Sequence, residues 1–319
     1  MLSSVPLDWI CPSCRRRLDP SVRDLCCRSC AVRFPVEDGI ADFLAGRYYD
    51  RFDPAAALSE DQRLGLCLEE CGAAGRIDNY YRPRLERLRA EGPVVRRLRV
   101  LDCGCGNGIG VDRLNESGFE AWGTDASALR KHQWQERRLR ERLFVADALA
   151  LPAPTGFFDV VIASGVLEHI GVREQRNPRY SVERLPDRDA LRNRFLSELL
   201  RVTDREGRIW LDFPNGAYPI DFWHGDRPGE ARWHSRAEGF LPSLKDVRKS
   251  LASIDDGAVV RALSPHGRLA FHQVGLHLYG RALRIPARIF LRLTATWPLR
   301  FLSGTGLNPY MVLEITRRG

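Results

Sequence analysis

The 319-residue sequence is poor in lysine and has no long hydrophobic run. Of its 49 basic residues only Lys131, Lys245 and Lys249 are lysines, and the arginines are spread along the whole chain. A surface that binds nucleic acid would concentrate basic residues, so the formal charge of +8 indicates a composition bias and solvated arginine faces. No run approaches the roughly 18 uninterrupted apolar residues that a membrane-spanning helix requires.

The first ten residues also lack the basic start and the apolar core of a secretory signal. We therefore expect a cytoplasmic protein. A chain of this length can form one large α/β core together with a small accessory unit.

An apolar segment runs into a glycine-rich turn at residues 100–110, with the sequence VLDCGCGNGIG. Gly104, Gly106 and Gly108 remove side chains that would keep the backbone away from a ligand, and they allow positive φ. The dinucleotide fingerprint G-x-G-x-x-G is absent, because Ile109 and Val111 occupy the places of its third glycine. The turn therefore predicts a site for a nucleotide-like cofactor that is not a dinucleotide.

Two of the next apolar segments end in an acidic residue. Asp125 ends the segment 119–125, where an acid can accept hydrogen bonds from both ribose hydroxyls, and Asp147 ends the segment 143–147. The nearly continuous apolar run 157–164 predicts a strand buried on both faces. Each acid has an alternative role as the cap of a following helix.

These features together resemble the class I S-adenosylmethionine (SAM) dependent methyltransferases of the type 11/23 kind, over about residues 96 to 215. The resemblance implies a Rossmann-like α/β fold with a seven-stranded sheet of order 3-2-1-4-5-7-6, whose last strand is antiparallel. It also implies that Asp125 binds the ribose and that Asp147 accepts the adenine amino group. The cofactor-binding residues that it implies are Asp102, Gly104, Cys105, Gly106, Asn107, Gly108, Asp125, Ala126, Asp147, Ala148 and Ser164.

Four cysteines near the start have the spacing of a zinc ribbon. They form two C-x2-C pairs with twelve residues between them, Cys11 and Cys14, then Cys27 and Cys30. Four thiolates suit one tetrahedral Zn²⁺, whereas two disulfides, the alternative, are disfavoured in a cytosolic chain. Residues 7–44 resemble the small Trm112-like zinc ribbon, and this resemblance favours Cys27 over Cys26 as a ligand. We expect a structural metal, because so short a unit cannot bury enough apolar surface to fold alone.

We expect three units, namely the ribbon at 1–44, a helical linker or lid at 45–97, and the methyltransferase domain at 98–319 with an insertion at 266–306. In similar methyltransferases the linker region closes over SAM, which makes Tyr80, Tyr81 and Arg82 candidates for contacting its carboxylate. The start of a surface helix is the alternative.

The loop at 215–226 is dense in aromatic and titratable residues and follows the expected fifth strand. Open α/β sheets bind ligands at such loops, and residues that stack and donate hydrogen bonds suit a sugar or an aromatic acceptor. The loop resembles the PN-x-x-YP-x-D-x-x-H element of some methyltransferases of bacterial glycan and envelope biosynthesis. The alternative interpretation of this loop is that Phe222 and Trp223 only cover the hydrophobic core and do not bind a ligand. His169 and His224 are the candidate catalytic bases, because histidine changes charge near neutral pH.

We therefore expect O-methylation of a small-molecule, glycan or lipid-linked acceptor. One alternative is a base methyltransferase of ribosomal or transfer RNA, because the ribbon and core resemble a bacterial ribosomal RNA guanine methyltransferase; however, that family mixes a histidine among its zinc ligands. Another is a catalytically inactive SAM-fold binding module. Within the insertion, arginines at helical spacing predict a basic amphipathic helix, which suits either a lid or peripheral membrane contact through 281–302.

Overall fold

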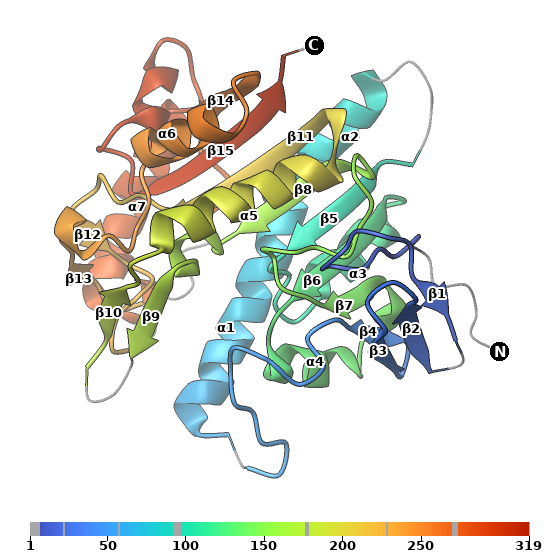
Figure 1. The fold of residues 1–319 in the computed structure, drawn as a ribbon. Coiled ribbons are helices and arrows are strands. Elements are labelled where there is room, and N and C mark those ends of the chain that lie inside the picture. Colours follow the sequence, from blue (N-terminus) through green and yellow to red (C-terminus); the bar gives the residue numbers. More distant parts are fainter. Residues whose placement is uncertain are drawn as a thin grey trace.

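The computed structural model describes residues 7–21, 23–56, 58–91, 97–175, 179–227, 229–269 and 274–318. A mixed sheet of eleven strands forms the centre of this part of the chain (Figure 1). Seven of the strands follow one another across the sheet as β7 (Leu143–Val145), β6 (Glu120–Asp125), β5 (Arg99–Cys103), β8 (Phe158–Ser164), β11 (Thr203–Pro214), β15 (Tyr310–Arg317) and β14 (Ala258–Leu263). Only β15 runs antiparallel to its neighbours within this group, which confirms the predicted order.

The sheet is larger than the seven strands expected, because the ribbon continues it. The strands β1 (Asp19–Pro20), β2 (Asp24–Cys27), β3 (Val32–Glu37) and β4 (Ile40–Asp42) form an antiparallel run, and β4 pairs in parallel with β7. Trp9 packs edge-on against Phe144 of β7 with ring centroids 4.8 Å apart. A unit this small has too little apolar surface for a core of its own, so it shares the core of the larger unit.

Helices cover both faces of the sheet. The helices are α1 (Glu60–Arg76), α2 (Arg82–Glu91), α3 (Ile109–Glu116), α4 (Ala128–Trp134), α5 (Arg188–Val202), α6 (Leu244–Ile254) and α7 (Leu278–Leu293), and a π-helical turn at Ile77–Tyr81 joins α1 to α2. Five short 3₁₀ turns lie at Arg140–Arg142, Leu167–His169, Arg236–Glu238, Val274–Leu276 and Leu299–Gly304, and two small hairpins pair β9 (Val172–Gln175) with β10 (Ser181–Arg184) and β12 (Ile220–Asp221) with β13 (Arg232–Trp233). None of the helices among the described residues is both long and apolar enough to span a bilayer.

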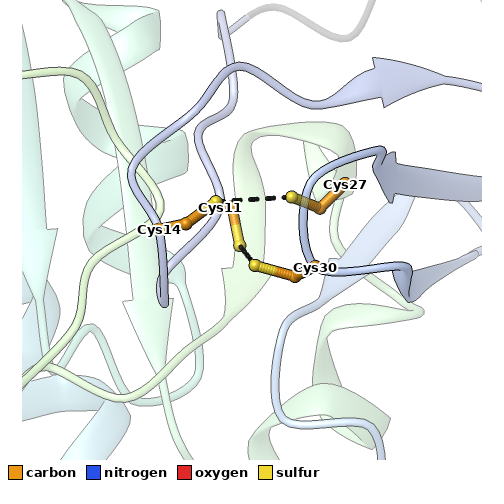
Figure 2. A group of neighbouring side chains, drawn as sticks. All are labelled: Cys11, Cys14, Cys27 and Cys30. Carbon is orange, nitrogen blue, oxygen red and sulfur yellow. Dashed lines mark hydrogen bonds between the residues drawn. The ribbon is translucent and has the colours of Figure 1, made fainter.

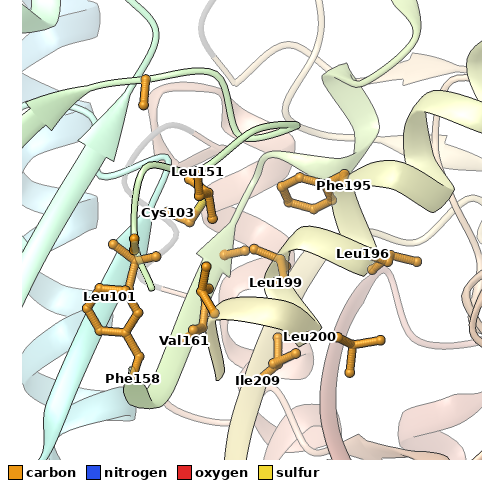
Figure 3. Close-up of a cluster of buried hydrophobic side chains, with 14 of the residues drawn as sticks. Leu101, Cys103, Leu151, Phe158, Val161, Phe195, Leu196, Leu199, Leu200 and Ile209 are labelled. Atoms are coloured by element: carbon orange, nitrogen blue, oxygen red, sulfur yellow. The ribbon is translucent and has the colours of Figure 1, made fainter. Parts of the chain in front are cut away.

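The central strand β8 has a nearly continuous apolar sequence because both of its faces are covered. All seven of its residues are buried. Val161 and Ala163 pack on the face that α5 and the ribbon cover, while Val160 and Ile162 pack with the π-helical turn and α3 on the other face. Figure 3 shows the first of these faces, with Val161 beside Leu199 of α5. Because β7, β6, β5, β8 and β11 run parallel, their carboxyl ends lie at one edge of the sheet, and the candidate site lies at this edge.

Candidate cofactor and acceptor site

A cavity of about 1470 Å³ opens at the carboxyl ends of the parallel strands. Eight of the eleven predicted cofactor residues line it, and they are Gly104, Cys105, Gly106, Asp125, Ala126, Asp147, Ala148 and Ser164. The other three lie behind its wall. Asp102 is fully buried, the Asn107 side chain accepts a hydrogen bond from the Ile109 amide at 3.1 Å, and Gly108 caps the start of α3.

The glycine turn has the backbone conformation that its sequence predicted. Gly104, Gly106 and Gly108 have φ of +79°, +57° and +79°. A Cβ atom at Gly104 would lie 2.2 Å from a methyl group of Val166, and one at Gly106 would lie 2.9 Å from a carboxylate oxygen of Glu69. Only glycine therefore lets these neighbouring segments close around the cavity.

Asp125 is held by the backbone at the end of β6. Its carboxylate accepts hydrogen bonds from the amides of Gly106 at 3.1 Å and Ala126 at 2.8 Å. Burial raises its pKa to about 6, against the opposing effect of Arg130. Asp125 does not cap α4, because the side chain of Ser127 does so. A partly desolvated carboxylate at this position suits the hydroxyls of a ribose.

Asp147 is exposed at the end of β7, where its side chain accepts from the Leu149 amide at 2.9 Å. Asp147 and Ala148 both line the cavity. This turn fixes the carboxylate without beginning a helix, so an adenine amino group is a suitable partner for its remaining acceptor capacity.

The linker contributes a cavity residue that the sequence did not indicate. Arg76, in the last turn of α1, lines the cavity and donates to Asp102 at 3.3 Å. The Nε atom of Arg76 and the Oδ1 atom of Asp102 are buried and have no hydrogen-bond partner among the described residues. Arg76, a buried cation that lines the cavity and keeps one donor atom without a partner, fits the carboxylate of the methionyl part of SAM, and Asp102 holds its guanidinium from behind.

The three linker residues that the sequence did indicate lie elsewhere. Tyr80 and Tyr81 are fully buried, and their hydroxyls donate to the carbonyl of Ser264 at 2.7 Å and to Asp212. Arg82 forms an ion pair with Asp78 at 3.0 Å. The last residue of α1, Arg76, lines the cavity instead.

A buried ionic network joins the cofactor half of the cavity to the other half. Asp212, at the carboxyl end of β11, accepts from Arg268 at 2.8 and 3.0 Å, from Ser164 at 2.8 Å and from Tyr310 at 2.5 Å. Burial alone would raise the pKa of Asp212, but Arg268 and the hydroxyl donors lower it below its usual value. Ser164, Arg268 and Tyr310 line the cavity, so this network presents a fixed polar surface to a ligand.

The predicted acceptor loop forms the far wall. Tyr218, Phe222 and Trp223 line the cavity, and Trp223 also packs against Tyr310 with ring centroids 4.9 Å apart. The apolar face of α7 contributes further wall residues, among them Phe290. This half of the cavity therefore offers apolar and aromatic surface.

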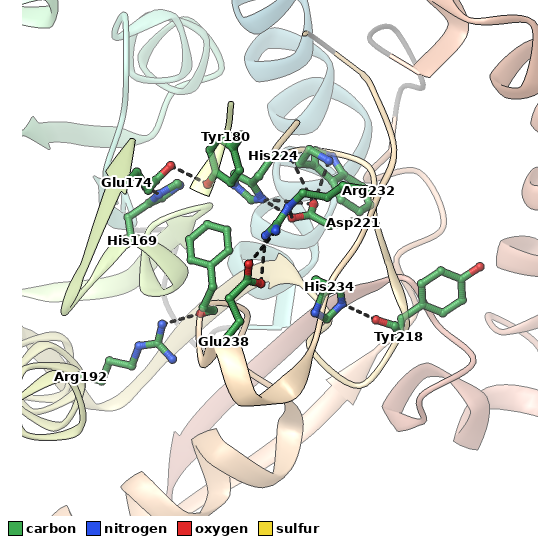
Figure 4. A network of polar contacts seen from close by, with 12 residues as sticks. His169, Glu174, Tyr180, Arg192, Tyr218, Asp221, His224, Arg232, His234 and Glu238 are labelled. Atoms are coloured by element: carbon green, nitrogen blue, oxygen red, sulfur yellow. Dashed lines mark hydrogen bonds and ion pairs between the residues drawn. The ribbon is translucent and has the colours of Figure 1, made fainter. Parts of the chain in front are cut away.

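The two candidate bases lie side by side, although 55 positions separate them. The rings of His169 and His224 have centroids 5.3 Å apart. His169 lines the cavity and bonds through Nδ1 to Glu174, while Nδ1 of His224 lies 3.0 Å from a carboxylate oxygen of Asp221 (Figure 4). Each imidazole is thus oriented by an acid.

The four ribbon cysteines converge on one point (Figure 2). Their sulfur atoms all lie within 4.8 Å of one another, with Cys14 to Cys27 at 3.5 Å and Cys11 to Cys30 at 3.9 Å. Four sulfurs around Zn²⁺ at about 2.3 Å would be about 3.8 Å apart, so the donor set fits a tetrahedral zinc ion. Cys26 is not in the cluster, because successive residues of β2 point to opposite faces.

Residues 101–211 match the sequence profile of a family described as a methyltransferase domain. No curated protein sequence matches the chain. A TehB-like SAM-dependent methyltransferase from Corynebacterium glutamicum is similar in structure, with 15% identity, coverage of 77% of this chain and 88% of that chain, and a TM-score of 0.43. A SAM-dependent methyltransferase from Mesorhizobium loti is similar too, with 17% identity, coverage of 73% and 96%, and a TM-score of 0.41.

We predict that the ribbon binds one zinc ion and depends on it for folding. Cys27→Ser should lose this ion, because three thiolates and a hydroxyl form a much poorer site, whereas Cys26→Ser should keep it. Metal analysis of the purified variants measures both outcomes. Zinc retained in Cys27→Ser and lost in Cys26→Ser would show that the ligand assignment is wrong.

Proposed function

Because residues 101–211 constitute a methyltransferase domain, we propose that the chain transfers a methyl group from SAM to an oxygen atom of a small-molecule, glycan or lipid-linked acceptor. The observation that carries this proposal is a single cavity that contains the glycine turn at one end and, at the other, an aromatic wall with His169, whose ring packs against His224. A transferase needs both ligands in one site, so that the acceptor lies in line with the methyl group.

The cofactor half has a partner for each part of SAM. Asp125 and Asp147 line the cavity and would bind the ribose and the adenine amino group. Arg76 also lines the cavity and would bind the carboxylate of the amino-acid end, while Asp102 behind it holds the guanidinium. When bound, SAM supplies a methyl group on a positively charged sulfur. The residues of this half bind the nucleoside, and they contribute to methyl transfer only by positioning the methyl group.

The acceptor half of the cavity must provide a group that removes the proton of the acceptor hydroxyl during methyl transfer. As the acceptor oxygen forms its bond to the methyl carbon, the carbon–sulfur bond breaks toward sulfur, and the hydroxyl proton has to leave. His169 and His224 are the groups placed to take it, since carboxylates orient both rings. Tyr218, Phe222 and Trp223 offer faces on which a sugar or an aromatic ring can stack.

We predict that His224→Ala retains the affinity for S-adenosylhomocysteine and slows methyl transfer about a hundredfold, the usual effect of losing a general base. His132→Ala, an exposed histidine on α4, is the matched control and should change neither quantity. Calorimetry measures the affinity, and transfer of label from methyl-labelled SAM to the lipid and small-molecule fractions of a bacterial extract measures turnover. Binding of S-adenosylhomocysteine without transfer to any fraction would favour the inactive binding module.

The raised pKa of Asp125 leads to a second prediction, which concerns the pH dependence of cofactor binding. Ribose hydroxyls donate to the ionised carboxylate of Asp125, whose pKa is about 6. The affinity for the nucleoside is therefore highest at pH values above 6 and falls as the pH drops through this value. The affinity for S-adenosylhomocysteine should therefore fall about tenfold between pH 7.5 and pH 5. Asp125→Asn should bind at least tenfold more weakly at pH 7.5 and lose this dependence.

The control for this experiment is Asp256→Asn, which removes an exposed carboxylate beyond the end of α6. It should bind with wild-type affinity and the wild-type pH dependence. A wild-type affinity that stays constant down to pH 5 in the folded protein would remove Asp125 from the ribose site.

The surface of α7 supports an acceptor that is linked to lipid. From residue 257 to residue 313 the sequence contains seven arginines and no acidic residue. Ile285, Ile289, Trp297 and Phe301 are exposed on this segment, at 68%, 56%, 88% and 66% of their full accessibility. Exposed apolar side chains among arginines are typical of a helix that lies on an anionic membrane. Since the inner face of α7 lines the cavity, an acceptor anchored in the membrane would enter there.

We predict that the protein cosediments with vesicles of phosphatidylglycerol and phosphatidylcholine at low salt and dissociates as the salt concentration rises. The double variant Ile285→Glu with Ile289→Glu should lose this binding, because it removes apolar contacts and adds negative charge. Leu64→Glu, at an exposed leucine of α1, is the matched control. Binding that is absent in the wild type, or equally reduced by the control, would contradict membrane docking through α7.

A further inference from the structure

A second group of metal-ligating side chains lies beside the acceptor half of the cavity, which one of them, His169, lines. Glu168, His169 and His224 each offer one ligand atom, and these atoms lie within 4.8 Å of one another. Glu168 and His169 come from the 3₁₀ turn after β8, whereas His224 comes from the loop after β11. The fold therefore brings a carboxylate and two imidazoles together from two separate strand ends.

Glu168 indicates that this group binds a ligand. Its side chain belongs to a residue that is only 1% exposed, and its Oε2 atom is buried without a hydrogen-bond partner among the described residues. A buried carboxylate oxygen that lacks a partner is destabilising, and native proteins rarely retain one without a reason. A cation between Glu168 and the two imidazoles would satisfy this oxygen.

Both histidines are also oriented as metal ligands are. Nδ1 of His224 lies 3.0 Å from Asp221, whose carboxylate is held in turn by Arg232 at 3.3 Å and by the Trp223 amide at 2.9 Å. Nδ1 of His169 bonds to Glu174. A carboxylate on Nδ1 fixes the neutral tautomer with its lone pair on Nε2, and metal-binding histidines usually have this arrangement.

Glu174 is itself fixed by a second donor. The hydroxyl of Tyr180 donates to Glu174 at 2.7 Å, and Tyr180 lies over His224 in a stacked arrangement (Figure 4). The acids that orient the two rings are thus restrained by further hydrogen bonds, which is the support that a preorganised metal site requires.

We propose that Glu168, His169 and His224 bind a divalent transition-metal ion whose open coordination positions face the cavity. Two imidazoles and one carboxylate favour ions such as Mn²⁺, Fe²⁺, Co²⁺ or Zn²⁺ over Mg²⁺, which prefers oxygen ligands. Three protein ligands leave positions for other groups, as in catalytic metal sites. His169 and its partner Glu174 both line the cavity, so an acceptor can reach the ion.

The role of this site in the reaction rests on the proposed function. The site extends that function because it indicates a class of acceptor. An ion of coordination number five or six, such as Mn²⁺, Fe²⁺ or Co²⁺, would keep at least two positions beyond its three protein ligands, and these would suit an acceptor with two neighbouring oxygens, such as a vicinal diol, a catechol or a 2-hydroxycarboxylate. Coordination lowers the pKa of a bound hydroxyl, so its proton leaves to water. The resulting oxygen lone pair then forms the bond to the methyl carbon as the carbon–sulfur bond breaks. With the ion bound, the two imidazoles act as its ligands, and water takes the proton that the proposed function assigns to them when no ion is bound.

The test counts the metal ions in the full chain, with the ribbon zinc in place. After dialysis against Co²⁺, the wild type should hold two divalent ions per chain, summed over all metals. Glu168→Gln and His224→Ala should each hold one, and His132→Ala should hold two. The affinity for S-adenosylhomocysteine, which should stay unchanged in all three variants, reports that they are folded.

One ion in the wild type, or two in both Glu168→Gln and His224→Ala, would overturn the site. The same count separates this proposal from the proposed function. Binding of S-adenosylhomocysteine and methyl transfer with a single ion per chain would leave the methyltransferase intact and remove the metal site. With two ions, transfer to catechol-type or diol acceptors should rise with Co²⁺ concentration in the wild type and not in Glu168→Gln, and equal rates in the two proteins would overturn the acceptor class.

Discussion

The buried ion pair of Asp212 and Arg268 holds the two halves of the site together. Asp212 ends a central strand, and Arg268 belongs to the insertion between β14 and β15. The hydroxyls of Tyr81, Ser164 and Tyr310 complete the shell of Asp212. Removing one partner of a buried pair leaves an uncompensated charge and typically costs about 3–5 kcal/mol. The linker, the sheet and the insertion are thus fixed relative to one another at the cavity.

The ribbon shows how a unit without a core becomes part of a larger fold. Its strands extend the central sheet through β4 and β7, and Arg15 reaches across to Glu198 of α5 at 2.7 Å. This attachment lies on the same side of the sheet order as the strands whose ends carry Asp125 and Asp147. The ribbon and α7 lie at opposite ends of the molecule (Figure 1), so the cluster of four cysteines is distant from the exposed apolar surface of α7.

The acceptor half gains its character from elements that are remote in sequence. The turn after β8, the loop after β11 and the insertion helix α7 each contribute one wall. An aromatic surface, oriented imidazoles and a basic amphipathic exterior therefore occur within one region. This combination of surfaces is consistent with the proposal that the acceptor has an oxygen-rich reacting group and an apolar anchor.

The sequence alone determined the features that depend on local chemistry and periodicity. The glycines of the turn have the positive φ that their spacing implied, the apolar run at 157–164 is a strand buried on both faces, and the order of the seven core strands is as predicted. The C-x2-C pairs lie close together as well. For the glycines, the buried strand and the cysteine pairs, the residues that matter are close in the chain or repeat with the period of a strand, so their arrangement can be inferred without the fold. The order of the core strands was instead implied by the resemblance to class I methyltransferases.

Only the tertiary structure decided which distant side chains meet. In the linker, Arg76 at the end of α1 lines the cavity, whereas Tyr80 and Tyr81 of the π-helical turn that follows are fully buried. Arg268 meets Asp212 across 56 positions, and Glu168 meets His224 across a similar separation. No local pattern encodes such contacts, since they depend on how strands and loops pack in three dimensions. The extension of the sheet by the ribbon has the same cause, because the pairing of β4 with β7 joins segments about a hundred residues apart.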